Sequence, residues 1–268
     1  MSLNVDAPLI HPTAIIHPKA VIGNKVKIGP FCVIGENVTL HDGVELHTNV
    51  VINGYTTIQK NCQVHSQCVI GGSPQDLKYK GEISYVEIGE NTILREFNTV
   101  HSATHEGEKT IIGNNCFLMA YCHVAHNSII GNNVVMANNA SLAGHVVIEN
   151  NAIIGGLSGI HQFVKVGAYS LIGGLSKVTQ DVPPYIKVDG HPVVPHGLNS
   201  LGLKRNGFTD DVISQLKNAY KVLYRSGLSL EESIRKIEQE CIKGPEIQHF
   251  VNFIRDSLNS PHHRGICR

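Results

Sequence analysis

An aliphatic residue or methionine recurs at every sixth position of the chain from Ile10 to Val178. This frame has 29 positions, and 26 of them are Ile, Leu, Val or Met. The exceptions are Asp76, Glu82 and Glu106. An α-helix repeats near 3.6 residues and a simple strand at about two, so neither explains a strict period of six. The period predicts a mainly β fold, a solenoid of short parallel strands in which three hexads complete one triangular coil.

The fourth residue after each aliphatic one is small or slim, so that large and small side chains together fill a narrow core. Five of the seven cysteines occupy this slot: Cys32, Cys62, Cys68, Cys116 and Cys122. We interpret them as buried free thiols rather than as a disulfide framework or a metal cluster. Free thiols are typical of the cytoplasm, and we expect the protein to be cytoplasmic.

Glycine often follows the large residue, as at Gly23 and Gly113, and asparagine is frequent two positions later, as at Asn37, Asn91 and Asn115. Both residue types tolerate a positive φ angle. We therefore expect the glycines and the asparagines alike to form the corners between short strands.

The composition excludes several classes of function. Acidic and basic residues balance at 22 each, which gives no electrostatic support for nucleic-acid binding. No apolar run approaches the roughly 18 residues of a membrane span, and Met1 to Leu9 lacks the basic start and apolar stretch of a signal peptide. We expect neither a membrane span nor a secretory signal.

Two stretches interrupt the repeat but leave its frame intact. They cover residues 72–85 and 105–110, and we predict that each is a loop extruded from the solenoid. Pro183 and Pro184 follow the last hexad, and because proline cannot donate to a strand ladder, we expect the solenoid to stop there. The prediction is a hexapeptide-repeat β-helix over residues 1–190 and a connector with a C-terminal α-helical domain over residues 191–268.

Capping signals divide the C-terminal domain after a connector that runs to about Phe208. The expected helices are one from the N-cap Thr209 to Gly227, one from a Ser229–Glu232 capping box to Gly244, and one that Pro245 opens.

Histidine is abundant, and four of the sixteen histidines gather late in the repeats, at His123, His126, His145 and His161. Six others directly follow the large aliphatic residue, at an outward corner of the coil. His126, Gly144 and Gln162 share one place in their hexads, and each stands three hexads after the one before it. We therefore expect these three residues to stack along one edge of the prism, on successive coils.

This column favours a catalytic site. An imidazole is the usual general base near neutral pH. A glycine stacked next to it leaves a backbone N–H unshielded, which suits a developing oxyanion. Two alternatives stay open at this point. Histidines pooled between subunits suit a zinc enzyme of the hexapeptide carbonic-anhydrase type, and a non-catalytic β-helix scaffold needs no such cluster at all.

Nine segments carry a resemblance that covers essentially the whole chain: HPTAIIHP, IGPFCVIG, QDLKY, LMAYCHVAHN, ANNASLAGHV, AIIGGLSGIHQF, QDVPPY, GLKRNGF and NAYKVLYRSG. At these segments the chain closely resembles the UDP-N-acetylglucosamine 3-O-acyltransferases, which catalyse the first step of lipid A synthesis in Gram-negative bacteria. The resemblance implies a left-handed parallel β-helix, a homotrimer, and active sites between subunits. It implies transfer of an R-3-hydroxyacyl group from acyl carrier protein to the glucosamine 3-hydroxyl of UDP-N-acetylglucosamine, or to a 3-amino analogue, with no cofactor and no metal.

The resemblance also implies roles for individual residues. His126 matches the general base and Gly144 the oxyanion donor of the family. The remaining matches are the substrate-contacting Asp76 and Lys78, the residues His123, His145, His161 and Gln162 that line the sugar, acyl and nucleotide regions, the nucleotide contacts Asn199 and Arg205, and Gly174 at the floor of the acyl groove. A glycine at that floor leaves room for a long acyl chain.

The chain departs from the family pattern at three positions. The residue after the general base is often Asp in the family and is Asn127 here, so the resemblance implies no carboxylate that orients His126. Asn206 stands where a second Arg is common, and Leu201 replaces an acidic residue seen in some members. On the first expected helix, Lys217, Lys221 and Arg225 are candidates to attract the acidic carrier protein, although such residues usually form a solvated face.

Overall fold

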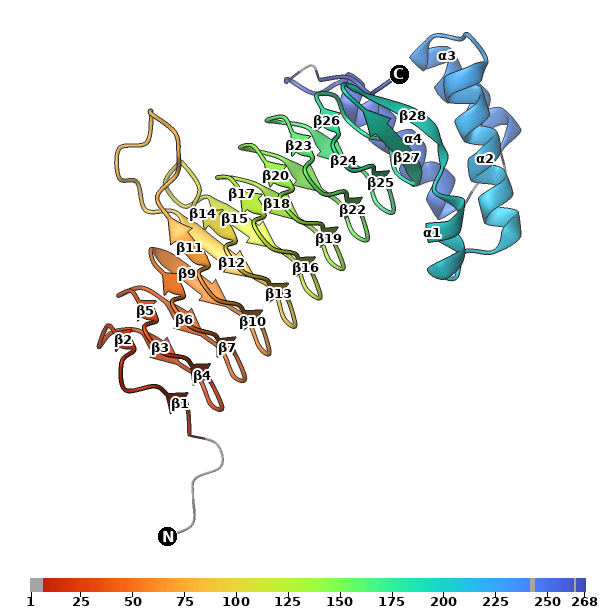
Figure 1. Ribbon diagram of the computed structural model, residues 1–268. Helices are drawn as coiled ribbons and strands as arrows, with labels where there is room; N and C mark the ends of the chain where they lie inside the picture. The colour runs from red at the N-terminus through yellow and green to blue at the C-terminus, as the bar shows by residue number, and fades with distance from the viewer. Residues whose placement is uncertain (1–6, 242–243, 263) are drawn as a thin grey trace.

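Three sheets of short parallel strands form a triangular prism that makes up most of the molecule (Figure 1). The computed structural model describes residues 7–241, 244–262 and 264–268. From β1 to β26 the chain passes through the three sheets in turn, so that consecutive strands belong to different sheets and each strand pairs with the strand one coil away. The predicted solenoid is therefore confirmed.

The strands are very short and are best described sheet by sheet. The first sheet contains, in spatial order, β1 (Leu9–Ile10), β4 (Lys27–Ile28), β7 (Glu45–Leu46), β10 (Gln63–Val64), β13 (Ile93–Leu94), β16 (Phe117–Leu118), β19 (Val135–Met136), β22 (Ile153–Ile154), β25 (Leu171–Ile172), β27 (Ile186–Gly190) and β28 (Val193–Leu198). The second contains β2 (Ile15–Ile16), β5 (Val33–Ile34), β8 (Val51–Ile52), β11 (Val69–Gly72), β14 (Thr99–His101), β17 (His123–Val124), β20 (Ser141–Leu142), β23 (Gly159–Ile160) and β26 (Lys177–Val178). The third contains β3 (Val21–Ile22), β6 (Thr39–Leu40), β9 (Tyr55–Ile58), β12 (Tyr85–Ile88), β15 (Lys109–Ile112), β18 (Ile129–Ile130), β21 (Val147–Ile148) and β24 (Lys165–Val166).

The hexad frame forms the core of the prism. Most frame residues close a strand and point inward, and pairs such as Met136 and Ile154, which are three hexads apart, lie opposite each other in the ladder. The small slots are buried between them, and the five cysteines of these slots are buried and free, as predicted; Cys241 and Cys267, outside the repeat, are buried and free as well. In the described part of the chain β1 pairs on one side only, with β4, and Ile10 is 41% exposed although it belongs to the frame.

The φ angles at the corners contradict part of the prediction for glycine and asparagine. Asn91 and Asn115 do adopt positive φ angles, of 57° and 55°. Asn37, Gly23 and Gly113 do not. The glycines are required for a different reason, because neighbouring coils approach too closely for a side chain at these positions. A Cβ atom at Gly113 would lie 2.5 Å from the carbonyl oxygen of the next coil.

Several bulky residues also occupy left-handed corners, which the sequence did not indicate. Phe31, Phe97 and Tyr121 have φ angles of 59°, 63° and 64°. Such angles are uncommon for residues other than glycine and asparagine. Their side chains are exposed, so the corner geometry is imposed by the stacking of the coils on either side of them.

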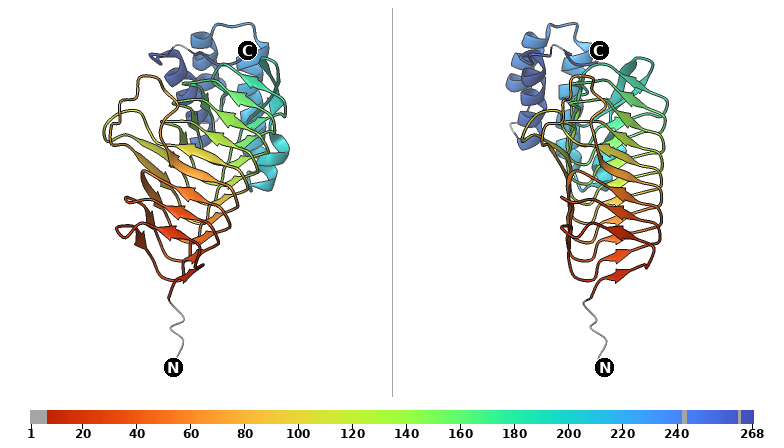
Figure 2. Two further views of the ribbon diagram at one scale, coloured as in Figure 1. Left: turned by 60° about the vertical axis from the view of Figure 1, so that its left-hand side comes forward. Right: turned by 90° about the vertical axis from the view of Figure 1, so that its left-hand side faces the viewer.

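The two predicted loops leave the prism at the same corner, the one that leads from the second sheet to the third. One lies between β11 and β12 and the other between β14 and β15, and both project from the side of the prism (Figures 1 and 2). They are bonded to each other: the Ile83 N–H donates to Glu106 Oε2 at 2.8 Å, and the Ser84 hydroxyl donates to the Ala103 carbonyl at 2.5 Å. The frame resumes after each loop, as predicted.

The end of the solenoid differs from the prediction. The chain does not leave the prism at Pro183 and Pro184, because both residues lie in a corner where no ladder bond is needed. Strand β27 then pairs in parallel with β25, and β28 folds back against it in an antiparallel hairpin. Val188 lies opposite Ile172 although the two are less than three hexads apart, so this strand falls outside the repeat. The predicted connector contains this hairpin and the short helix α1 (Ser200–Arg205).

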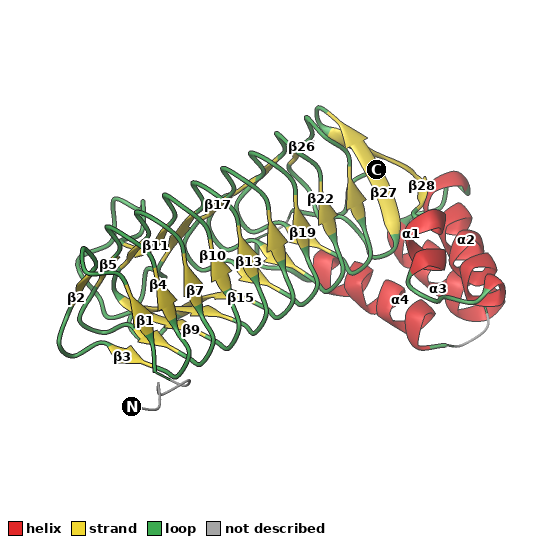
Figure 3. Cartoon of the chain, turned by 60° about the horizontal axis from the view of Figure 1, so that its bottom comes forward, coloured by secondary structure: helices red, strands yellow, loops and turns green. Residues whose placement is uncertain are grey.

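Three longer helices follow, α2 (Asp210–Arg225), α3 (Leu230–Glu240) and α4 (Pro245–Leu258), and they pack at one end of the prism (Figure 3). The predicted N-cap Thr209 and the predicted capping box of Ser229 are both confirmed. The prediction that Gly244 closes the second helix is wrong. Helix α3 ends at Glu240, and Gly244 is the N-cap of α4.

A buried carboxylate attaches the helices and the tail to the last coils. Asp181 accepts hydrogen bonds from the Lys165 N–H at 2.8 Å and from the Ser257 hydroxyl of α4 at 2.6 Å. Its backbone also bonds to Gly265 and Cys267 of the tail. Burial raises the pKa of this carboxyl above its usual range, because burial disfavours the charged form. The hydrogen bonds from Ser257 and Lys165 stabilise the carboxylate and oppose this rise. The division of the chain at residue 190 stays a prediction; that residue lies at the end of β27.

We predict that a reducing agent leaves the thermal stability of the protein unchanged. All seven thiols are free and buried, and burial raises the pKa of Cys62, Cys122 and Cys68 to about 11, about 11 and about 12, so that none of these three is a reactive thiolate. The measurement is thermal unfolding by circular dichroism with and without a thiol reductant. A large fall in Tm on reduction would contradict the arrangement of the core.

Candidate active site

The predicted column of His126, Gly144 and Gln162 lies at the corner between the second and third sheets, on three successive coils. Each residue follows a strand of the second sheet, β17, β20 and β23, and these strands pair in register. The imidazole of His126 lies directly against Gly144. A Cβ atom at Gly144 would come within 2.5 Å of His126 Nε2, so the ring takes this position only because residue 144 is glycine. The predicted stacking is confirmed.

A cavity of about 440 Å³ opens beside this column. Five of the predicted site residues line it: Asp76, Lys78, His126, His145 and Gln162. Asp76 and Lys78 come from the first loop, which reaches the column because both loops leave the prism at the column's own corner. The cavity gathers acidic, basic and imidazole groups from segments far apart in the sequence, which is typical of a binding or catalytic site.

Four further residues line the cavity that the sequence did not single out: Tyr79, Thr104, His105 and Phe163. Tyr79 and His105 belong to the two predicted loops. Their position in a break of the repeat was the sequence feature that could have marked them as site residues. Phe163 stands three hexads after His145, and the same spacing that found the column would have found it. Thr104 precedes the second break and carried no signal.

Hydrogen bonds fix the His126 ring. Its Nδ1 lies 2.8 Å from Oδ1 of Asn127, which is buried. An amide oxygen accepts hydrogen bonds and cannot donate, so Nδ1 carries the hydrogen. Nε2 is then the unprotonated nitrogen of the neutral ring, and this is the atom next to Gly144. The N–H of Gly144 donates to no acceptor in the described part of the chain.

An aromatic stack closes one side of the cavity. The ring of His145 meets that of His126 edge-on at 5.2 Å and stacks on Phe163 at 4.8 Å, and His262 of the tail stacks on Phe163 at 3.9 Å. Burial lowers the pKa of His145, and the neighbouring His126 lowers it further. His145 therefore stays neutral in the folded protein at pH values where an exposed histidine begins to take up a proton.

The other predicted site residues lie outside this cavity. His123 belongs to the face of the second sheet and contacts Thr99 at 2.7 Å, and burial lowers its pKa. His161 is exposed. The amide of Asn199 is engaged on both sides, because it caps α1 and donates to the Tyr169 carbonyl at 2.9 Å.

Gly174 and Arg205 are also distant in the fold. Gly174 follows β25 at the corner between the first and second sheets, which is a different edge of the prism from that of His126. Arg205 is exposed in the last turn of α1. A single chain therefore does not place these two residues on the His126 column.

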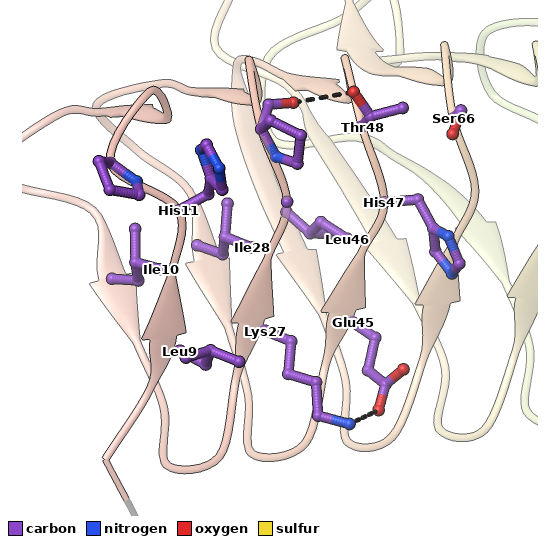
Figure 4. A pocket seen from close by; sticks show the side chains of 13 residues that line it. Leu9, Ile10, His11, Lys27, Ile28, Glu45, Leu46, His47, Thr48 and Ser66 are labelled. Atoms are coloured by element: carbon purple, nitrogen blue, oxygen red, sulfur yellow. Dashed lines mark hydrogen bonds and ion pairs between the residues drawn. The ribbon is translucent and has the colours of Figure 1, made fainter.

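A larger hollow of about 590 Å³ lies over the first coils (Figure 4). Leu9 and Ile10 contribute exposed apolar surface, and Lys27 and Glu45 form an ion pair at one edge of the hollow at 2.6 Å. Lys27 and Glu45 pair with each other, and none of the described residues that line the hollow belongs to the two loops. We therefore place the candidate active site in the smaller and more polar cavity.

Two features of the chain bear on the alternatives. Within residues 7–241, 244–262 and 264–268, no group of three or more His, Cys, Asp or Glu side chains is arranged to hold a metal ion. Over the same residues, no helix has the length and apolar character needed to cross a membrane.

The fold and the cavity define a hexapeptide-repeat transferase. The family model of bacterial transferase hexapeptide repeats matches residues 19–54 and 109–144, and a model of the second domain of UDP-N-acetylglucosamine O-acyltransferases matches residues 181–267. The acyl-[acyl-carrier-protein]–UDP-N-acetylglucosamine O-acyltransferase of Thermodesulfovibrio yellowstonii is 50% identical over 221 residues, which are 82% of this chain and 84% of the relative. The chain therefore belongs to the acyl-[acyl-carrier-protein]–UDP-N-acetylglucosamine O-acyltransferase family.

Solved structures agree with this assignment. A UDP-N-acetylglucosamine acyltransferase from Bacteroides fragilis superposes with a TM-score of 0.92 at 40% identity, covering 97% of this chain and 100% of the other. A structure from Acinetobacter baumannii gives a TM-score of 0.90 at 42% identity, with the same coverage. The predicted left-handed parallel β-helix with C-terminal helices is confirmed, and the zinc-enzyme and scaffold alternatives are not favoured.

We predict that the folded protein loses stability as the pH falls below the ordinary histidine range. The pKa of His145 is lower in the folded protein than in the unfolded chain, so the unfolded chain binds more protons there. The stability that neutral His145 contributes is present above its unfolded pKa and is lost as the pH falls toward its folded pKa. Thermal unfolding at about pH 7.5 and about pH 5.5 measures the effect.

The variant His145→Gln should show a smaller drop in Tm between these two pH values than the wild type. His41→Gln, a change at a histidine outside the cavity, should leave the drop as large as in the wild type. Equal drops in the wild type and His145→Gln would refute the prediction.

Proposed function

We propose that the protein transfers an R-3-hydroxyacyl group from acyl carrier protein to the 3-hydroxyl of UDP-N-acetylglucosamine, the first step of lipid A synthesis. The observation that carries the proposal is the contact between His126 and Gly144, which places the imidazole against a glycine whose N–H is unbonded in the described part of the chain. The names of the curated relatives support this choice of substrates, because they include both acyl carrier protein and UDP-N-acetylglucosamine.

His126 acts as the general base in this proposal. Nε2 is unprotonated in the neutral ring and takes the proton from the sugar 3-hydroxyl as that oxygen attacks the thioester carbon. The carbonyl oxygen then becomes an oxyanion, and the N–H of Gly144 stabilises it. The imidazolium of His126 returns its proton to the leaving thiol of the carrier protein. A thioester is already activated, so the reaction needs a base, an oxyanion donor and correct positioning, and no cofactor.

The cavity walls bind the acceptor. We propose that Lys78 meets a phosphate of the nucleotide sugar, and that Asp76, His145 and Gln162 contact the sugar and acyl groups. His123, His161, Asn199 and Arg205 are proposed to line the more distant acyl and nucleotide regions.

The active site is proposed to lie between subunits of a homotrimer. The residues assigned to the acyl and nucleotide ends, Gly174 and Arg205 among them, lie away from the His126 column within one chain. A neighbouring copy can supply those surfaces. Exposed apolar side chains along the prism, such as Leu157 at 61% and Leu175 at 71%, support a partner subunit at the corner that carries Gly174.

The carrier protein is proposed to approach along the C-terminal helices, where Lys217, Lys221 and Arg225 of α2 offer positive charge. Lys217 and Lys221 are exposed, which suits a transient and electrostatically steered encounter. We propose a cytoplasmic location, because acyl carrier protein and nucleotide sugars are substrates of the cytoplasm and the core depends on free thiols.

We predict that His126→Ala folds and binds UDP-N-acetylglucosamine but loses turnover. Loss of a general base costs roughly 10²–10⁴-fold in rate. The measurement is acyl transfer from acyl carrier protein followed by mass spectrometry of the product, with the binding of UDP-N-acetylglucosamine measured by calorimetry. His41→Ala is the control and should retain activity. Near-normal turnover by a folded His126→Ala protein would refute the assignment of the base.

Gly174 allows a second test, of acyl-chain selection. A Cβ atom at Gly174 would meet its nearest neighbour, the Gly156 carbonyl oxygen, at 3.4 Å, so a side chain fits there without disturbing the prism. We predict that Gly174→Met shifts the preference toward shorter acyl donors, because overpacking an apolar groove costs about 1–3 kcal/mol and affects only long chains. The measurement is kcat/KM across a series of acyl-carrier thioesters.

Gly174→Ala should give a smaller shift in the same direction, and the binding of UDP-N-acetylglucosamine should not change in either variant. If Gly174→Met slows all chain lengths equally, the residue does not measure the acyl chain.

A further inference from the structure

A second residue, Asn127, holds the ring of His126, and its own contacts decide how it does so. Asn127 follows His126 in the left-handed corner, with a φ angle of 61°, and is 8% exposed. Its Oδ1 accepts from His126 Nδ1 at 2.8 Å and from the Thr104 N–H at 3.1 Å. Its Nδ2 donates to Glu108 Oε2 at 2.5 Å. All four groups of this network lie at one corner of the prism.

The orientation of the Asn127 amide follows from its two other partners. A backbone N–H can only donate, so the amide atom facing Thr104 must be oxygen. An ionised carboxylate can only accept, so the atom facing Glu108 must be the NH₂ group. A flipped amide would face Thr104 with a donor and Glu108 with an acceptor, and both bonds would be lost. The oxygen therefore faces His126 and selects the ring tautomer with hydrogen on Nδ1.

Glu108 is well placed to enforce this orientation. It lies at the end of the second loop, directly before β15, and its carbonyl accepts from the Tyr85 N–H at 2.9 Å. Its backbone is therefore fixed to the neighbouring coil while its carboxylate reaches the buried amide. A bond from an amide to a carboxylate is stronger than one between neutral groups. The carboxylate thus acts on the ring of His126 through one intervening side chain.

We propose that Glu108 is a positioning residue, which acts through Asn127 to keep Nε2 of His126 free as the general base. The proposal rests on the proposed function of His126, since only a ring with a catalytic Nε2 makes the tautomer matter for rate. Glu108 does not touch the substrate in this scheme. Its loss leaves only Thr104, whose N–H and hydroxyl donate to the amide oxygen at 3.1 and 3.0 Å, to oppose rotation of the amide, so that the wrong nitrogen of the ring carries the hydrogen for part of the time.

An exchange of the two side-chain types gives the sharpest test. In Asn127→Asp, two carboxylates face each other and the bond between residues 127 and 108 is lost. In the double variant Asn127→Asp/Glu108→Gln, the new glutamine donates to the new aspartate, and the bond returns with its direction reversed. The carboxylate then lies directly against Nδ1 and favours the imidazolium, so the acid limb of the pH profile should move to higher pH.

The experiment measures kcat, KM for UDP-N-acetylglucosamine and the pH profile of kcat/KM for the wild type and these variants. We expect Glu108→Ala to lower kcat about 10- to 100-fold with little change in KM, the range typical of a lost orienting contact. Asn127→Asp should also lose activity, because Glu108 repels the new carboxylate and displaces it from His126 Nδ1. The double variant should recover most of that loss on the alkaline side of the profile.

The matched control is Glu106→Gln, which alters another carboxylate of the same loop. Glu106 accepts from the Ile83 N–H at 2.8 Å and serves to hold the two loops together. Glu106→Gln should leave the pH profile unchanged. The proposal is overturned if Glu106→Gln reproduces the loss seen in Glu108→Ala, if Glu108→Ala is fully active, or if the double variant stays as slow as Asn127→Asp.

A readout without turnover separates this proposal from the proposed function. The ¹⁵N chemical shifts of the His126 ring report which nitrogen carries hydrogen. The wild type should show the Nδ1–H tautomer, and Glu108→Ala should show a mixture. If the wild type does not transfer acyl groups but the tautomer still depends on Glu108, the proposed function fails and the positioning role stands. If Glu108→Ala keeps a pure Nδ1–H tautomer, the positioning role fails whatever the activity.

Discussion

The register between residues three hexads apart determines the rest of this structure. Every coil donates its backbone N–H groups to the coil beside it, so a side chain at one position is repeated directly above and below by residues of the same slot. A strict hexad follows, because a slip of one residue would turn core side chains outward. The same register brings His126, Gly144 and Gln162 together although they are distant in sequence.

Close stacking also decides which residues the site can use. Neighbouring coils approach so closely that a side chain in one coil often occupies the space of the Cβ atom in the next. His126 occupies the space above Gly144 in this way. The glycine therefore has two proposed effects, since it admits the ring and it exposes an N–H. The loops complete the site from the preceding coils, because the corner at which they leave the prism is the corner of the column.

Much of this arrangement was predictable from sequence, and the failures have clear physical causes. The period predicted the prism, the core cysteines and the column, and local capping chemistry predicted where α2 and α4 begin. The role of Gly113 was mistaken because close contact between coils and a positive φ angle both select glycine. Strand β27 was missed because Val188 does not fall on the hexad frame. The contact from Glu108 to Asn127 was not predictable, because it depends on the path of a loop outside the period.

The two ends of the prism differ in how well they are covered and bonded. Coils contact only their neighbours, so the stability of such a solenoid is close to a sum of local terms. The last coils are covered by helices and tied to the tail through Asp181, whereas the first coil leaves Ile10 partly in water. We therefore expect fraying to start at the N-terminal coil and to proceed one coil at a time toward the middle of the prism. We therefore expect the coils that precede the His126 column to open before the coils that carry the site.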